Sequence, residues 1–147
     1  MDNATRGTAV VPQSPALQAA RERGAVYVRG ELSLESNLLE AEAAHLAGIS
    51  VADLLARRTV GDFYAFQATS DSLRFPRWQF AAPQDGLRVL IRAFANKSVW
   101  ALHLFSARAN MYLDDMSPRE YLMRPDYGVE AVRRAVGYRL CEHQGAA

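Results

Sequence analysis

The chain has 147 residues, half of them hydrophobic and a tenth aromatic, so it carries enough apolar surface for one compact domain or two small modules. Its 17 basic and 16 acidic residues nearly cancel. This balance excludes the strong overall positive field that drives non-specific nucleic-acid binding, so any contact with DNA must be local.

Location and cofactors are constrained by what the sequence lacks. The N-terminal stretch has no charged-then-apolar export signal, and the longest uncharged apolar run, 98–107, is too short to span a bilayer. The lone Cys141 cannot form an internal disulfide, and no Cys or His cluster has zinc-ligand spacing. We therefore expect a cytoplasmic protein with no membrane segment, no metal and no cofactor.

The first third of the chain is the least regular. Residues 1–24 mix Ala, Thr, Gln, Ser and Pro without a period, which predicts a flexible arm with at most a short helix over 16–23. Residues 25–29 (AVYVR) have strand composition and lie between two glycines, which predicts a strand. We expect a module over 25–80 after the arm, and a C-terminal helical domain over 81–147.

A helical pattern begins at Leu34, breaks at Gly48 and resumes after Ser50, which is placed to cap a second helix over 51–58. Helix, glycine turn and capped helix are the layout of a helix-turn-helix, although ordinary scaffold helices share it. Two strand-like runs, 63–67 and 73–80, follow around a polar turn. They predict a wing-like hairpin in which Pro76 lies at an edge or ends the second strand.

Candidate DNA contacts lie on the second helix of this unit and on the hairpin: Ser50, Arg57, Arg58, Arg74 and Arg77. The four arginines would form a local positive strip able to contact phosphates or a guanine edge. The alternative is that they only solubilise the surface. Glu40 and Glu42 on the preceding helix would weaken attraction to DNA.

Two apolar helices are expected next. Residues 84–86 predict a turn, after which an i, i+3, i+4, i+7 stripe marks a buried helix face: Leu87, Leu90, Ile91 and Phe94. Ser98 is placed to cap the following helix, which is apolar around most of its circumference. Such a helix is expected at the centre of the domain.

The sharpest local signal is Ser117-Pro-Arg-Glu120, a capping box with proline at the first helical position, so a helix is expected to start there. Pro125 should end it quickly. A last helix then carries apolar residues on one face and basic residues elsewhere. The combination of hydrogen-bond donors and an aromatic side chain on this last helix favours a protein interface. The alternative is that this face of the helix is only solvated. The candidate partner contacts are Arg133, Arg134, Tyr138, Arg139 and Leu140.

Groups for catalysis are missing from the sequence. His45, His103 and His143 stand far apart, and the first two are expected to be buried, hydrogen-bonded side chains and not ligands. Asp114 and Asp115 are adjacent and are expected in a solvated loop, although paired carboxylates can act as acid and base. Nucleophile-elbow, Walker and dinucleotide-binding motifs are absent. We expect a mainly α protein that binds and is not an enzyme.

The order of RFPRWQF, a glycine turn, VWALHLF, LDDMSPREYL and GVEAVRRAV over residues 74–140 resembles the toxin-binding domain of the Xre/MbcA/ParS antitoxins. The matching positions are Phe75, Pro76, Gln79 and Phe80 in the aromatic strand, Trp100 in the next helix, Leu113, Ser117, Pro118, Glu120 and Leu122 in the capped element, and Val129, Glu130 and Val132 in the closing helix. Residues 38–58 are similar to the helix-turn-helix that often precedes that domain. Asp115 replaces the family's usual Gly, so its turn must change conformation or accept strain.

The resemblance implies a function. Proteins of this family pair with RES-domain toxins, which consume or use NAD. They block the toxin's active site, often with their C-terminal end, and repress their own operon as a dimer or higher oligomer. We therefore expect an antitoxin-like protein whose helix over 129–140 contacts the toxin, with an arginine entering an anion-binding cleft. The alternative is a stand-alone DNA-binding regulator whose C-terminal domain dimerises.

Overall fold

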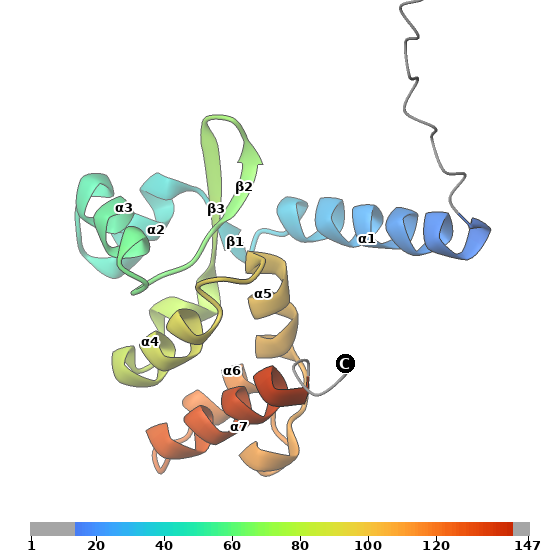
Figure 1. The fold of residues 1–147 in the computed structure, drawn as a ribbon. Coiled ribbons are helices and arrows are strands. Elements are labelled where there is room, and N and C mark those ends of the chain that lie inside the picture. Colours follow the sequence, from blue (N-terminus) through green and yellow to red (C-terminus); the bar gives the residue numbers. More distant parts are fainter. Residues whose placement is uncertain (1–13, 143–147) are drawn as a thin grey trace, which may run out of the picture. The chain divides into compact units, whose positions relative to one another are not determined.

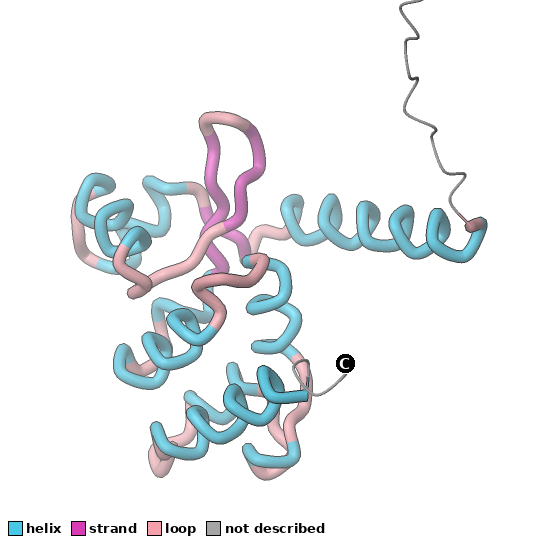
Figure 2. The backbone as a smooth tube through the Cα atoms, viewed as in Figure 1, coloured by secondary structure: helices cyan, strands magenta, loops and turns pink. Residues whose placement is uncertain are grey.

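The structure, a computed structural model, describes residues 14–142, with side chains described as far as Arg139. The chain divides into two compact units, residues 1–33 and 34–147. It is mainly helical, and the second unit also holds a small three-stranded antiparallel sheet (Figure 1; Figure 2). Within residues 14–142, no helix is both long enough and apolar enough to cross a membrane.

The described part of the first unit is one helix, α1 (Pro15–Ser33). It corrects the strand predicted over 25–29 and extends the short helix predicted over 16–23. The helix start has a capping signal, because the amide of Leu17 donates to Ser14 Oγ at 3.2 Å and proline occupies the first helical position. A strand here would need a partner strand for its backbone groups, whereas a helix satisfies them internally. The remainder of the predicted arm, 1–13, lies outside the described residues.

The sheet of the second unit has the order β1-β3-β2 and is antiparallel. Strands β2 (Phe66–Thr69) and β3 (Ser72–Pro76) form the predicted hairpin, and Pro76 ends β3 as expected. Strand β1 (Asn37–Leu38) pairs with β3, with Leu38 opposite Phe75. This pairing corrects the prediction that the helical pattern begins at Leu34, because 37–38 are extended against the sheet.

Two short helices, α2 (Glu40–Ala47) and α3 (Val51–Thr59), follow β1 and pack against each other. The turn between them contains Gly48 at φ +70°, a backbone conformation that glycine adopts without cost. Ser50 caps α3 as predicted, since its Oγ accepts from the amide of Asp53 at 3.1 Å. Helix α2 also contacts β3, so this pair is anchored on the sheet.

The segment after the hairpin departs from the predicted strand over 73–80. Pro76 closes β3, and residues Arg77–Phe80 wind into a single 3-10 turn, η1. Proline cannot donate to a strand ladder, which explains why the extended geometry stops there. Gln79 is buried by this turn and is 1% exposed. Its side chain therefore points into the unit and not along a sheet face.

Helix α4 (Gln84–Ala93) begins where a turn was predicted over 84–86. Gly86 is a helical residue in the first turn, and the preceding Pro83 at φ −60° leads the chain directly into the helix. The predicted apolar stripe is confirmed as buried: Leu87 and Leu90 at 0%, Ile91 at 8% and Phe94 at 7% exposure. Helix α4 packs on the C-terminal helix.

Helix α5 (Val99–Ala107) starts at the predicted cap, with Ser98 Oγ accepting from the amide of Trp100 at 3.2 Å. Its predicted position at the centre of the domain is wrong. Only Leu102, His103 and Ser106 are buried, while Leu104 and Phe105 are half-buried. One apolar face of α5 packs inward, and a second apolar face is left near the surface.

The chain ends in η2 (Met111–Leu113), α6 (Pro118–Leu122) and α7 (Val129–Glu142). The predicted capping box is confirmed, because the Ser117 and Glu120 side chains each accept from the other's amide. Helix α7 buries one face, with Val132, Ala135 and Val136 at 0%, 1% and 3% exposure. It packs on α4 and η2.

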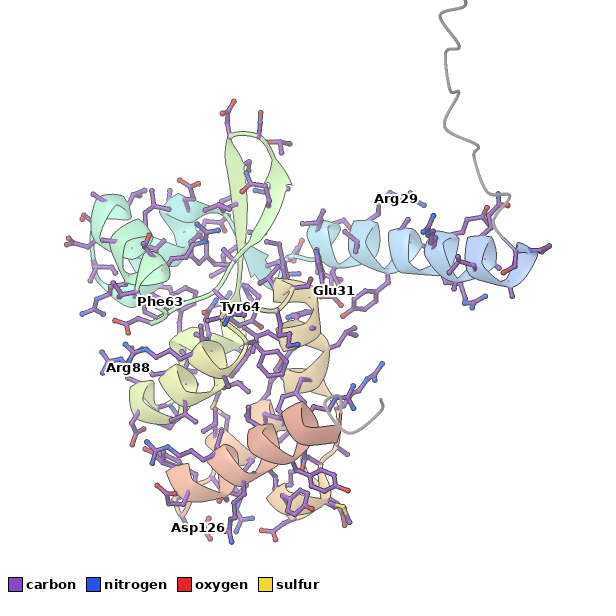
Figure 3. All side chains as sticks on the ribbon, in the orientation of Figure 1. Arg29, Glu31, Phe63, Tyr64, Arg88 and Asp126 are labelled. Carbon is purple, nitrogen blue, oxygen red and sulfur yellow. The ribbon has the colours of Figure 1, made fainter. Side chains whose placement is uncertain are left out.

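The packing of residues 34–142 is continuous across the connection at 80–86. The Arg88 side chain extends from α4 (Figure 3). Its Nε lies 2.8 Å from Oδ1 of Asp62, a residue before the hairpin that is 6% exposed. Gln84 Nε2 donates to the carbonyl of the same Asp62 at 3.1 Å. The start of α4 is therefore tied to the residues that follow α3.

Gly86 permits the close packing of α4 on α6. A Cβ built on Gly86 would lie 2.4 Å from Cδ2 of the buried Leu122. We expect Gly86→Ala to reduce the free energy of unfolding by about 1–3 kcal/mol, because a methyl group must be forced into a filled space. Urea denaturation followed by circular dichroism measures this change.

Gly137→Ala is the matched control, because Gly137 is an exposed residue of α7 and nothing lies within 4 Å of its Cβ position. Alanine there should leave stability unchanged or raise it by up to about 1 kcal/mol through helix propensity. Equal effects of the two substitutions would show that the α4–α6 contact does not disfavour a methyl group at Gly86.

A hydrogen bond between Tyr127 and Asp85 gives a pH-dependent contribution to stability. The Tyr127 hydroxyl donates to Asp85 Oδ1 at 2.8 Å, and this bond, with the Gly86 amide, lowers the pKa of Asp85 below its ordinary 3.8. A lowered folded pKa stabilises the fold above the unfolded value, and this stability is lost as pH falls through the folded pKa. We expect Tyr127→Phe to be less stable than wild type at about pH 7, and the difference to shrink below about pH 4.

The measurement is urea denaturation of both proteins across this pH range. A stability difference that is the same at about pH 7 and about pH 3 would mean that the hydroxyl acts without the charge of Asp85.

Candidate functional site

The second unit contains a groove of about 570 Å³ between α5, the segment from Arg108 to Asp115, and α7. We call it the α5–α7 groove. Most of its lining side chains are apolar or aromatic, and the others are basic, amide or acidic: Phe94, Lys97, Ala101, Leu104, Phe105, Arg108, Ala109, Asn110, Met111, Tyr112, Asp115, Ala135, Tyr138 and Arg139. Its volume lies in the range of sites that bind ligands or anchor side chains.

Aromatic pairs form both walls of the α5–α7 groove. The rings of Phe94 and Phe105 lie 5.3 Å apart, which joins the end of α4 to α5. The rings of Tyr112 and Tyr138 lie 5.0 Å apart and join η2 to α7. Met111 at the mouth is 74% exposed, so a large flexible apolar side chain faces solvent there.

The loop that forms one edge of the groove is held by its own backbone. Asn110 and Met116 form an antiparallel bridge, and Asn110 Oδ1 accepts from the amide of Tyr112 at 2.9 Å. Asp114 and Asp115 both adopt left-handed backbone conformations, at φ +54° and φ +59°. The sequence predicted that the turn at Asp115 either changes conformation or accepts strain. Asp115 takes the strained, left-handed conformation, which glycine adopts freely.

The rim of the groove is predominantly positive. Lys97, Arg108 and Arg139 line it, and within the described residues none of the three forms an ion pair. Asp115 is the one acidic residue in the lining. An anionic group near this rim would meet cations whose charge is not already neutralised.

Helix α5 is fixed to the base of the hairpin by a buried polar network. Gln79 Oε1 accepts from the amide of Tyr64, and Gln79 Nε2 donates to the Tyr64 carbonyl, each at 2.8 Å. The Tyr64 hydroxyl accepts from Trp78 Nε1 at 2.8 Å and lies 2.9 Å from Nδ1 of His103 on α5. The wall of the groove is thus connected through His103 to the hairpin.

Arg119 extends this network from α6. Its Nε donates to Ser106 Oγ at 2.9 Å, and its Nη2 lies 2.9 Å from His103 Nδ1. The guanidinium also lies over the Trp78 ring, 5.4 Å from the centroid, which is a cation–π distance. His103 is 2% exposed and serves this network, so the expectation of a buried, hydrogen-bonded histidine is confirmed.

Other candidate residues for chemistry are separated. His45 is exposed on α2, which corrects its expected burial, and His143 lies outside the described residues. Asp114 and Asp115 are exposed in a loop as predicted, and Asp114 pairs with Arg124 at 2.7 Å. Within residues 14–142, no group of three or more His, Cys, Asp or Glu side chains is placed to hold a metal ion.

Two of the predicted partner contacts reach the α5–α7 groove. Tyr138 and Arg139 line it, whereas Arg133 and Arg134 are exposed on α7 outside it. Arg133 is engaged by Glu130 one turn earlier on the helix. The side chain of Leu140 lies outside the described residues.

The predicted DNA contacts are distributed over separate elements. Arg57 and Arg58 are exposed in the last turn of α3, and Arg74 is half-buried with its Nη1 donating to Ser72 Oγ at 3.0 Å. Arg77 is exposed and lines a shallow hollow with residues of β1 and α2, including Glu42. No residue of α3 lines that hollow, so a continuous strip of four arginines stays a prediction.

The sequence interpretation missed most residues of the groove: Lys97, Ala101, Leu104, Phe105, Arg108, Met111 and Tyr112 were not among the candidate contacts. One signal for them was present. Residues 99–107 are more apolar than a single buried face requires, and such an excess indicates either a central helix or a second contact surface. A central helix was the prediction, whereas the exposure of Ala101 and the partial exposure of Leu104 and Phe105 favour a second contact surface.

In comparisons with known proteins, no protein-family model, no curated protein and no solved structure matches the chain. The resemblance to antitoxins therefore rests on the sequence motifs alone.

The Gln79 contact gives a test of the network that holds α5. We expect Gln79→Leu to reduce the free energy of unfolding by about 2–5 kcal/mol, because it removes the hydrogen bonds that Gln79 makes to both backbone groups of Tyr64 in the interior. Gln18→Leu on α1 is the matched control and should change stability by less than about 0.5 kcal/mol, because Gln18 is exposed. Urea denaturation measures both, and a Gln79→Leu protein as stable as wild type would refute this role.

Proposed function

We propose that the chain is an antitoxin-like protein, which binds and neutralises a RES-type toxin through the α5–α7 groove and the exposed residues of α7. The observation that carries the proposal is the groove itself, an apolar hollow with a basic rim that includes two of the residues selected from sequence, Tyr138 and Arg139. Aromatic and arginine side chains at a hollow are the composition typical of binding hot spots.

The chemistry of the groove favours binding over catalysis. Among the described residues, its lining contains one carboxylate, Asp115, and no histidine, cysteine or serine, so neither a carboxylate pair nor a serine–histidine or cysteine–histidine pair lies in it. The buried histidine of this unit, His103, is committed to Tyr64 and Arg119. A surface of this composition supports recognition of a macromolecule.

Helix α7 is suited to present contact residues rigidly. Its buried face packs on α4 and η2 and holds Val132, Ala135 and Val136, while the side chains of Arg134, Tyr138 and Arg139 are exposed. Arg134 and Arg139 form no ion pair within the described residues, so both are available to an acidic partner surface. A fixed helix loses little conformational freedom on binding.

A role in DNA binding is part of the same proposal. The pair α2 and α3, joined by a turn at Gly48 and capped by Ser50, supports a helix-turn-helix that places Arg57 and Arg58 near operator DNA. In this proposal a homodimer or higher oligomer represses its own operon. The acidic residues Glu40 and Glu42 of α2 would limit affinity for DNA without a second bound copy.

The test uses the full chain co-expressed with the product of the adjacent reading frame. Removal of α7 is unsuitable, because it would expose the core face of Val132 and Val136. Point variants of exposed residues are used instead: Arg139→Glu and Tyr138→Ala, with Arg57→Glu on α3 as a control. We expect wild type and Arg57→Glu to co-purify with the adjacent product and to relieve its toxicity, and the two α7 variants to bind about tenfold or more weakly.

An adjacent product that is not toxic, or that binds all variants equally, would overturn the proposal. Specific binding to the promoter DNA of the operon with no protein partner would support the alternative of a stand-alone regulator.

A further inference from the structure

The α5–α7 groove has features that indicate the chemistry of its occupant. Its walls expose apolar surface from α5 that the fold does not cover, notably Ala101, Leu104 and Phe105. Apolar surface of this kind is stabilised by covering it with another apolar group. The occupant therefore needs at least one large aliphatic or aromatic side chain.

The charges at the rim define a second requirement. Lys97 in the turn between α4 and α5, Arg108 at the end of α5 and Arg139 on α7 line the groove from three different segments. Within the described residues they have no acidic partners, and the lining offers one carboxylate, Asp115, against them. This excess of positive charge is complementary to acidic groups that flank an apolar anchor.

The form of the polar groups favours a protein segment over a small molecule. Small-molecule sites usually combine an apolar pocket with several fixed polar groups that orient the ligand. Here the fixed polar group, Asn110, already uses its Oδ1 to accept from the amide of Tyr112, and the remaining polar side chains are exposed. Long cations at an open rim suit a chain that carries several acids along its length.

We propose that the α5–α7 groove receives an acidic segment of a partner protein, in which a large apolar side chain enters between Phe105 and Tyr138 and flanking carboxylates meet Lys97, Arg108 and Arg139. This inference rests on the proposed function, because it names the part of the partner that the antitoxin-like surface grips. It adds that the partner contributes the anchor and this chain contributes the hollow.

Selection from a phage-displayed library of random short peptides on the immobilised full chain tests the chemistry without the natural partner. We expect the enriched peptides to combine Asp or Glu with Leu, Phe or Trp, and to compete with one another for a single site. Enrichment of basic or purely polar peptides, or no enrichment, would overturn the proposal.

Two groove variants and one control locate the site by fluorescence polarisation with the most enriched peptide. Ala101→Trp fills the groove from an exposed position and should abolish binding. Arg108→Glu should weaken binding about fivefold or more, whereas Arg23→Glu makes the same charge change at an exposed residue of α1 outside the groove lining and should have no effect. Thermal melts confirm that each variant is folded. Equal binding by all variants would place the peptide elsewhere and refute the assignment.

The outcomes are distinguishable from those of the co-expression experiment. If acidic peptides bind in the groove but the adjacent product is not toxic, this inference stands and the antitoxin role is refuted. If Ala101→Trp still binds the adjacent product as well as wild type does, the antitoxin role stands and the groove is not the binding site.

Discussion

The pairing of the Gln79 side chain with the backbone of Tyr64 is the constraint on which the second unit depends. One buried amide satisfies the donor and the acceptor of a peptide segment that belongs to no strand. That segment positions the Tyr64 ring, whose hydroxyl joins Trp78 and His103. Without this contact, two buried backbone groups would lose their hydrogen bonds to Gln79, and the polar connection between the hairpin and α5 would be weakened.

The consequence of that connection is that α5 is held at the side of the core and not at its centre. Phe66 stacks on Trp100 with ring centroids 4.0 Å apart, which fixes the start of the helix against the hairpin. The inner face of α5 is then covered, and its other apolar face becomes a wall of the groove. Helix α7, packed on α4 and η2, supplies the opposite wall. The candidate site is therefore a product of where two helices are anchored.

Local signals in the sequence predicted the second unit well. The Ser50, Ser98 and Ser117 caps, the α4 stripe and the hairpin follow from short-range chemistry, and each is present. Predictions that depended on long-range pairing were wrong. Strand β1 exists only because residues 37–38 meet β3, and α1 replaces a strand because 25–29 have no partner strand. Composition could not reveal either pairing.

The candidate site was predictable only in part for the same reason. Tyr138 and Arg139 were identifiable because an amphipathic basic helix displays them whatever it packs against. Arg108 and Tyr112 reach the groove because the segment after α5 folds back, and nothing in their immediate neighbours indicates this. The antitoxin resemblance covers the same region of the chain but does not specify a hollow.

The bridge between Asn110 and Met116 has a consequence for kinetics. It closes the segment that includes η2, so the edge of the hollow is already ordered before anything enters it. Loops that become ordered only in a complex slow association and weaken the complex by the entropy they lose. Here the entropy of this segment is lost during folding and not during binding. The residence time of a bound partner should therefore depend on how well its side chain fills the groove, and little on loop closure.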